Sequence, residues 1–133
     1  MLKSCSYCGR IHDSKHDCGK RPTRKKKDTE TYRFHRSRAW THKSEQIRNR
    51  DNHMCQVCVR GLHNPVRMYE TEDLSVHHIE SVEDNNDRKL DDSNLITLCR
   101  RHHEMAEAGV IGKDVLHAIA HEQEERYWSS FGV

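Results

Sequence analysis

Cysteines and histidines in the middle of the chain have the types and spacing of metal ligands. Cys55 and Cys58 are separated by two residues, and Cys99 and His102 repeat that spacing. Zinc favours four thiolate and imidazole ligands in a tetrahedral arrangement, commonly supplied as two close pairs. The sequence therefore predicts a structural zinc site built from these four residues. The long interval between the two pairs leaves room for a second site.

A second set of cysteines lies near the start of the chain. Cys5 and Cys8 form a pair with the same spacing, and Cys18 supplies a third thiol. The fourth ligand is His12 or His16, and we favour His12 because only one residue separates His16 from Cys18. Three is an odd number for disulfides, so the composition favours two Cys₃His zinc sites in a reducing cytoplasm.

Other histidines lie among these ligands and suit hydrolytic chemistry. His103 follows His102 on a predicted helix, and a step of about 100° turns its side chain toward a different face. Hydrolysis of a phosphodiester needs a nucleophilic water, a base that deprotonates it and a cation near the developing charge. Histidine is the natural base near neutral pH. The doublet His77-His78, together with His103, could therefore form a reactive site beside the zinc.

The order of these residues resembles the HNH nuclease motif, also called the ββα-metal or His-Me finger. Residues 76–79 look like the first strand of that motif, residues 94–99 like the second, and His102-His103 like the start of its helix. The resemblance covers residues 54–109 and implies a small, zinc-stabilised α+β fold. His102 and His77 depart from the pattern, because many members have cysteine and aspartate there.

The resemblance also implies a role for each residue of the reactive site. His78 is expected to be the general base, and Asn94 is expected to orient its imidazole through a hydrogen bond. His77 and His103 are expected to bind one divalent ion. Glu107 lies four residues after His103 on the same helical face, and it either assists this ion or is a solvated carboxylate. With histidine at position 77, Mn²⁺, Ni²⁺ or Co²⁺ join Mg²⁺ as possible ions.

The charge distribution predicts contact with a polyanion. The first 60 residues contain 16 Lys and Arg against 6 Asp and Glu, whereas the rest contain 7 against 15. A basic half beside an acidic half is typical of a nucleic-acid-binding protein, although a solvated charged surface is the alternative. The predicted DNA-binding residues are Arg24, Lys25, Lys26, Lys27, Arg36, Arg38 and Lys43.

The chain has room for one small domain with appendages, and only 33% of it is hydrophobic. Such a thin core usually depends on metal for stability. Ser37 is the predicted N-cap of a basic helix, and 113–131 is predicted to be a C-terminal helix whose apolar residues cover the core. The predicted order is a zinc knuckle at 1–20, a basic linker at 21–35, the basic helix within 36–53, the core at 54–109 and the last helix within 110–133.

The expected function is that of a metal-dependent endonuclease acting on double-stranded DNA. One reactive site implies that one strand is cut per binding event. The size, the knuckle and the basic helix resemble phage-encoded nucleases associated with DNA packaging, which implies terminase or other packaging proteins as partners and the host cytoplasm as the location. The alternative is a non-catalytic zinc-dependent DNA-binding module or a packaging adaptor. No segment has the apolar run of a signal peptide or a membrane span.

Overall fold

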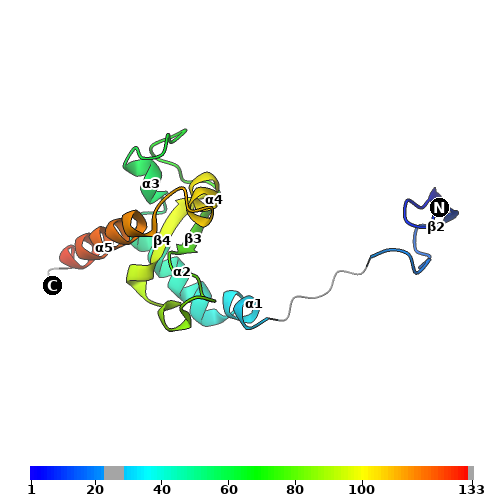
Figure 1. Ribbon diagram of the computed structural model, residues 1–133, viewed down its shortest axis with the longest axis horizontal. Helices are drawn as coiled ribbons and strands as arrows, with labels where there is room; N and C mark the ends of the chain where they lie inside the picture. The colour runs from blue at the N-terminus through cyan, green and yellow to red at the C-terminus, as the bar shows by residue number, and fades with distance from the viewer. Residues whose placement is uncertain (23–28, 132–133) are drawn as a thin grey trace.

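The computed structural model describes residues 1–22 and 29–131 (Figure 1). Residues 1–22 contain two short antiparallel strands, β1 (Leu2–Ser4) and β2 (Ile11–Asp13). The turn between these strands and the segment after β2 carry the three N-terminal cysteines. Four residues predicted to bind DNA lie outside the described part of the chain: Arg24, Lys25, Lys26 and Lys27.

Two consecutive helices precede the core. In α1 (Glu30–His35), the side chain of Thr29 accepts a hydrogen bond from the Tyr32 N–H, and Phe34 is buried. This helix corrects the prediction that the linker extends to residue 35. A single buried aromatic residue leaves no periodic pattern in so polar a segment, and for that reason the sequence did not reveal it. In α2 (Arg38–Arg50), Ser37 is the N-cap, as predicted.

The centre of the domain is a two-stranded antiparallel sheet followed by a helix. Strand β3 (Leu74–His78) pairs with β4 (Leu95–Cys99), and α4 (Arg100–Glu107) follows at once. This order of strand, loop, strand and helix is the predicted one. Gly109 has a φ of +78° directly after the helix, where a residue with a Cβ would be strained. Two 3₁₀ turns lie in the loop between the strands, η1 (Asn86–Arg88) and η2 (Asp92–Asn94).

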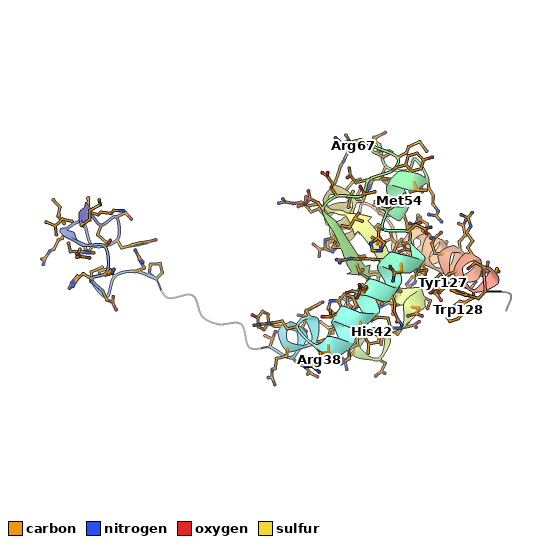
Figure 2. The ribbon with its side chains drawn as sticks, turned by 180° about the vertical axis from the view of Figure 1, so that it is seen from behind. Arg38, His42, Met54, Arg67, Tyr127 and Trp128 are labelled. Carbon is orange, nitrogen blue, oxygen red and sulfur yellow. The ribbon has the colours of Figure 1, made fainter. Side chains whose placement is uncertain are left out.

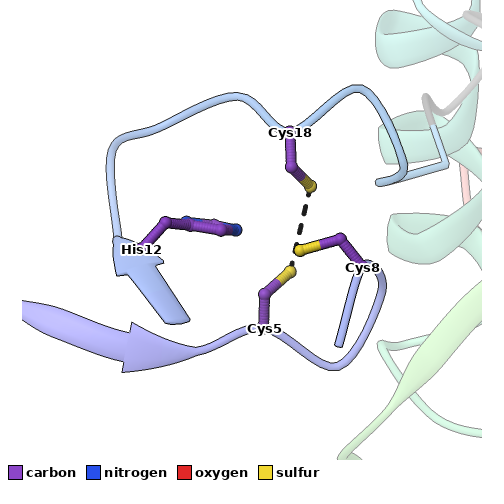
Figure 3. A group of neighbouring side chains, drawn as sticks. All are labelled: Cys5, Cys8, His12 and Cys18. Carbon is purple, nitrogen blue, oxygen red and sulfur yellow. Dashed lines mark hydrogen bonds between the residues drawn. The ribbon is translucent and has the colours of Figure 1, made fainter. Parts of the chain in front are cut away.

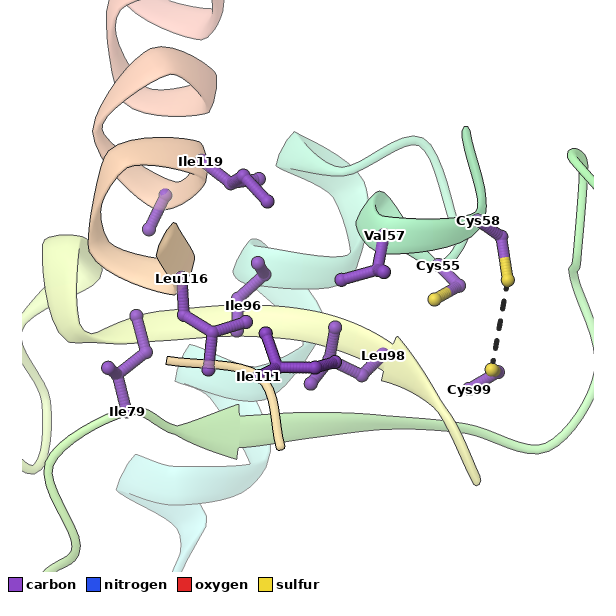
Figure 4. Close-up of a cluster of buried hydrophobic side chains, with 11 residues drawn as sticks. Cys55, Val57, Cys58, Ile79, Ile96, Leu98, Cys99, Ile111, Leu116 and Ile119 are labelled. Carbon is purple, nitrogen blue, oxygen red and sulfur yellow. Dashed lines mark hydrogen bonds between the residues drawn. The ribbon is translucent and has the colours of Figure 1, made fainter. Parts of the chain in front are cut away.

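The sheet separates two groups of buried side chains because successive residues of a strand point to opposite faces. Ile96 and Leu98 of β4 pack against Leu116 and Ile119 of the last helix, α5 (Lys113–Ser129). Cys55, Cys58 and Cys99 belong to the same cluster (Figure 4). The short helix α3 (Gln56–Val59) adds Val57 to this cluster. On the opposite face, α2 is packed on the sheet through Ile47, Val76 and Leu95, with Trp40 at the edge.

A buried arginine joins the elements of the domain. The Arg50 guanidinium donates to the carboxylates of Asp51 and Glu124 at 2.9 Å, and to the carbonyls of Asp92 and Leu95 at 2.8 and 2.7 Å. Arg50 is only 4% exposed, so these partners replace the water that the charge has lost. The network ties the end of α2 to β4, η2 and α5.

Helix α5 covers the core with only part of its length. Leu116 and Ile119 are buried, but Trp128 and Phe131 are 49% and 61% exposed. Figure 2 places Tyr127 and Trp128 near the C-terminal end of this helix. The prediction that the last aromatic residues cover the core was therefore wrong, because α5 extends beyond the short sheet. No helix within residues 1–22 and 29–131 has the length and hydropathy of a membrane span.

Candidate nuclease site

The predicted structural zinc ligands converge at one end of the sheet. The Nδ1 atom of His102 lies 3.4, 3.3 and 3.4 Å from the Sγ atoms of Cys55, Cys58 and Cys99. The Sγ atoms of Cys58 and Cys99 are 3.8 Å apart. Zinc bonds of about 2.3 Å to sulfur and about 2.0 Å to nitrogen imply edges of about 3.8 and 3.5 Å in a tetrahedron. The four residues therefore fit a zinc ion.

The surroundings of this cluster support the same interpretation. Burial, and then the charges of Cys55 and Cys99, raise the pKa of the Cys58 thiol, so three thiolates can coexist there only beside a cation. The Nε2 atom of His102 lies 3.2 Å from the carbonyl oxygen of His63, which fixes the proton on Nε2 and leaves Nδ1 free toward the sulfurs.

The N-terminal cluster also has the composition of a zinc site. Figure 3 shows Cys5, Cys8, His12 and Cys18 converging, and their ligand atoms all lie within 4.8 Å of one another. The Nδ1 atom of His12 donates a hydrogen bond to the carbonyl of Asp13. The buried Nε2 atom of His12 has no hydrogen-bond partner. A buried imidazole nitrogen without a hydrogen-bond partner, next to three sulfur atoms, is suited to bind a metal. The structure thus favours His12 over His16 as the fourth ligand.

Strand geometry gives the two histidines of the first doublet different surroundings. His77 pairs with Ile96, on the sheet face that α5 covers, whereas His78 pairs with Leu95, on the face that α2 covers. Adjacent strand residues point to opposite faces, so two neighbouring imidazoles cannot share one environment. His77 is therefore turned toward α4, and His78 toward Trp40.

His77, His103 and Glu107 form a third group of possible metal ligands. The rings of His77 and His103 have centroids 4.9 Å apart, and the His103 Nε2 atom lies 3.4 Å from a Glu107 carboxylate oxygen. Burial, and then the charge of His103, lower the pKa of His77 to about 4. His77 is consequently neutral at pH 7, which is the form that binds a metal. The expected divalent-ion residues are thus close together, and this donor set fits such an ion.

His78 is held by a backbone carbonyl in the loop between the strands. Its Nε2 atom lies 2.9 Å from the Lys89 carbonyl oxygen, which can only accept. The proton must therefore be on Nε2, and the lone pair of the neutral ring is on Nδ1. Burial lowers the pKa of His78, although the bond to Lys89 acts in the opposite direction. The ring is thus suited to accept a proton at Nδ1.

Asn94 is buried, but its partners differ from the predicted one. Its Nδ2 atom donates to the carbonyls of Glu80 and Arg88 at 3.0 and 3.2 Å, and its Oδ1 atom accepts from the Glu80 N–H at 2.8 Å. The His78 imidazole instead donates a hydrogen bond to the Lys89 carbonyl. Asn94 thus closes the loop that carries the Lys89 carbonyl.

Comparison with known proteins agrees with this geometry. Residues 55–109 match the model of the HNH endonuclease family. This segment is an HNH domain. Comparisons of the chain with curated proteins and with solved structures found no match. Residues 1–22, α1, α2 and α5 lie outside the matched residues.

The candidate site residues of the HNH domain line one cleft of about 620 Å³. Helix α2, although outside the matched segment, forms one wall of it. Trp40, Ser44 and Arg48 are spaced by four, so they lie along one face of that helix. The cleft is lined by His77, His78, His103, Glu107, Trp40 and Arg48.

The basic residues predicted to bind DNA have different surroundings. Arg38 is exposed, whereas Arg36 is exposed but donates to the Tyr32 hydroxyl at 2.9 Å. Lys43 forms an ion pair of 2.6 Å with Asp92, so its charge is already compensated within the protein. The sequence interpretation did not include Arg48, whose buried Nε atom has no hydrogen-bond partner. Its position eight residues after Trp40 on the basic helix was the only available signal.

Proposed function

We propose that this HNH domain is a metal-dependent endonuclease that hydrolyses phosphodiester bonds of double-stranded DNA. The main observation behind the proposal is that a candidate base and a group of candidate metal ligands lie in one cleft. His78 has a free Nδ1 lone pair, and the His77–His103–Glu107 group lies in the same cleft. A base and a group of metal ligands are the two components that this hydrolysis requires.

In this proposal the residues of the chain have separate roles. Nδ1 of His78 accepts the proton of the attacking water, while the Lys89 carbonyl keeps the other ring nitrogen protonated. His77, His103 and Glu107 hold a divalent ion: Mg²⁺, Mn²⁺, Ni²⁺ or Co²⁺. When bound, this ion supplies positive charge that stabilises the negative charge developing on the phosphate and on the leaving oxygen. His78 and the loop closed by Asn94 supply the geometry for proton transfer.

Arg48 is the residue that we propose for contact with a DNA phosphate inside the cleft. It lines the cleft, and among the described residues no carboxylate forms an ion pair with it. Its Nη2 atom donates to the Leu74 carbonyl at 3.4 Å, and a phosphate oxygen would provide a negatively charged acceptor in addition. We propose further contacts from Arg38 on α2 and from the basic residues of the N-terminal knuckle, including Lys3 and Arg10. These contacts would fix the position of DNA without reading its sequence.

We also propose two zinc ions with a structural role, one at each Cys₃His cluster. A single HNH site would cut one strand per binding event, so nicking is the expected reaction of a monomer. A role in phage DNA packaging, with terminase proteins as partners in the host cytoplasm, follows from the resemblance in size and organisation.

Relaxation of supercoiled plasmid tests the proposed function. The protein should produce nicked circles in Mg²⁺ or Mn²⁺ and none after the divalent ion is removed. His103→Ala should abolish this activity. His121→Ala is a matched control, because His121 pairs with Glu125 at the same i, i+4 spacing on the exposed face of α5. DNA binding without any strand cleavage would favour the non-catalytic module instead.

A further inference from the structure

The His78 ring is stacked on a tryptophan from outside the matched HNH segment. The Trp40 and His78 rings have centroids 4.5 Å apart and planes inclined by 28°. Ring pairs with centroids 4.5–7 Å apart are favourable contacts beyond the area that they bury. Trp40 belongs to α2, so its contact with His78 joins residues 38 positions apart in the chain.

Phe34, His35 and Lys89 also lie beside this imidazole, and the His35 ring centroid is 5.6 Å from that of His78. The Phe34 ring lies 5.9 Å from His78 and 5.5 Å from Trp40. The Lys89 ammonium lies 4.9 Å from the Phe34 centroid, while the carbonyl of the same lysine accepts from His78. Ser37 fixes the turn between the aromatic residues, because its hydroxyl donates to the Phe34 carbonyl and accepts from the Trp40 N–H.

These contacts restrict different motions of the imidazole. The hydrogen bond to Lys89 holds one ring atom at one point, but it still permits the ring to rotate about that direction. A flat aromatic surface opposes this rotation, because tilting the ring would break the stacked contact. Efficient proton transfer requires the base within about 2.6–3.2 Å of the proton donor, so rotation of this ring would reduce the rate.

We propose that Trp40 is a positioning residue, which fixes the plane of the His78 imidazole so that Nδ1 faces the cleft. This inference rests on the proposed nuclease function and deepens it. The catalytic unit then extends beyond residues 55–109 and includes the turn between α1 and α2. The segment expected to be a linker and a DNA-binding helix thereby becomes part of the reactive site.

A matched pair of substitutions separates this role from simple packing. Trp40 also contacts the buried cluster of Ile47, Val76 and Leu95, so Trp40→Ala would disturb the core. Trp40→Phe and Trp40→Leu both replace the indole with a smaller apolar side chain, but only phenylalanine retains a flat ring. Trp40→Met offers a second non-aromatic replacement if the leucine variant does not fold.

We expect Trp40→Phe to keep kcat within about threefold of wild type for plasmid nicking. Trp40→Leu and Trp40→Met should lower kcat by about 10-fold to 100-fold, as displacement of a catalytic group does. The KM, the zinc content and the thermal unfolding midpoint should be similar for the phenylalanine variant and for the folded non-aromatic variants. Equal kcat values for the phenylalanine and non-aromatic variants would overturn the proposal, as would a change confined to KM.

Nuclear magnetic resonance provides a readout that does not depend on catalysis. The ring current of Trp40 should shift the carbon-bound His78 ring protons upfield relative to those of the exposed His121. Trp40→Phe should keep part of this shift, and Trp40→Leu should remove it. Ring-proton chemical shifts of His78 equal to those of His121 in the wild-type protein would exclude the stacked arrangement. If wild-type protein does not nick DNA, the proposed function fails, and these spectra still decide whether Trp40 holds the ring.

Discussion

His102 and His103 are neighbours in sequence, but their imidazoles face different groups. The Nδ1 atom of His102 lies within 3.4 Å of three cysteine sulfurs, whereas the ring of His103 lies 4.9 Å from that of His77. The rotation of about 100° per helical residue produces this separation. Strand alternation separates His77 from His78 in the same way, so each doublet supplies two different environments.

Alanine substitutions at the second doublet should therefore have different effects. His102→Ala should lower zinc content by one ion per chain and destabilise the fold, because metal binding there contributes folding free energy. His103→Ala should leave zinc content and the unfolding midpoint unchanged but weaken divalent-ion binding and nicking. Elemental analysis, thermal unfolding and calorimetric titration with Mn²⁺ measure these properties. A folded, zinc-replete His102→Ala protein would refute the assignment.

The two zinc clusters should be separable by single cysteine substitutions. Freshly purified, reduced protein should contain two zinc ions per chain. Cys58→Ala should lose one ion and unfold the HNH domain, whose core includes Cys58. Cys5→Ala should also lose one ion, but the domain should unfold at its normal temperature because residues 1–22 supply none of the buried core. Elemental analysis combined with calorimetry distinguishes these results.

The sequence was sufficient for the parts of the fold that local spacing determines. Each cysteine pair lies within a few residues, α4 follows β4 at once, and a single loop over residues 79–94 joins β3 to β4. Local spacing alone does not decide between His12 and His16 as the fourth ligand. That choice depends on the pairing of β1 with β2. Lys3 pairs with His12 in that register, which places the imidazole beside the sulfurs.

Contacts between distant segments could not be predicted from the sequence. The partner of His78 is a backbone carbonyl, and backbone atoms carry no residue-specific signal. Trp40 and Ile47 are seven residues apart and share one face of α2, but this spacing does not indicate which side chain Trp40 covers. Arg50 appeared to be one of several basic residues on a polar helix. Its burial depends on acceptors 42 to 74 residues away.

Arg50→Met should destabilise the domain strongly. The substitution keeps much of the side-chain length but removes the buried positive charge beside Asp51, and it takes one donor from each of the Asp92 and Leu95 carbonyls. Breaking one partner of a buried ion pair costs about 3–5 kcal/mol. The exposed Arg38→Met is the control and should change the free energy of unfolding by less than about 0.5 kcal/mol. Urea denaturation measures both, and equal stability of the two variants would show that the network contributes little.

Arg48→Ala should weaken DNA binding more than removal of an arginine outside the cleft. A lost charge-assisted hydrogen bond of about 1.5–3 kcal/mol corresponds to at least a tenfold increase in Kd. The slope of the logarithm of affinity against the logarithm of salt concentration should also become less steep by about one, the value for one phosphate contact. Arg126→Ala on acidic α5 is the matched control. Fluorescence anisotropy with a DNA duplex makes the comparison, and similar Kd values for the two variants would argue against a phosphate contact by Arg48.

The most direct measurement of the central claim is plasmid nicking by His78→Ala under conditions in which the wild-type protein is active. If His78 is the base and not a metal ligand, the rate should fall by about 10²-fold to 10⁴-fold. Zinc content, divalent-ion binding and DNA affinity should remain at wild-type values, whereas the thermal unfolding midpoint should fall moderately because the substitution removes a buried ring that Trp40 and Phe34 contact. Nicking by His78→Ala at the wild-type rate would contradict the account, because the base would then have to be a different group in the cleft.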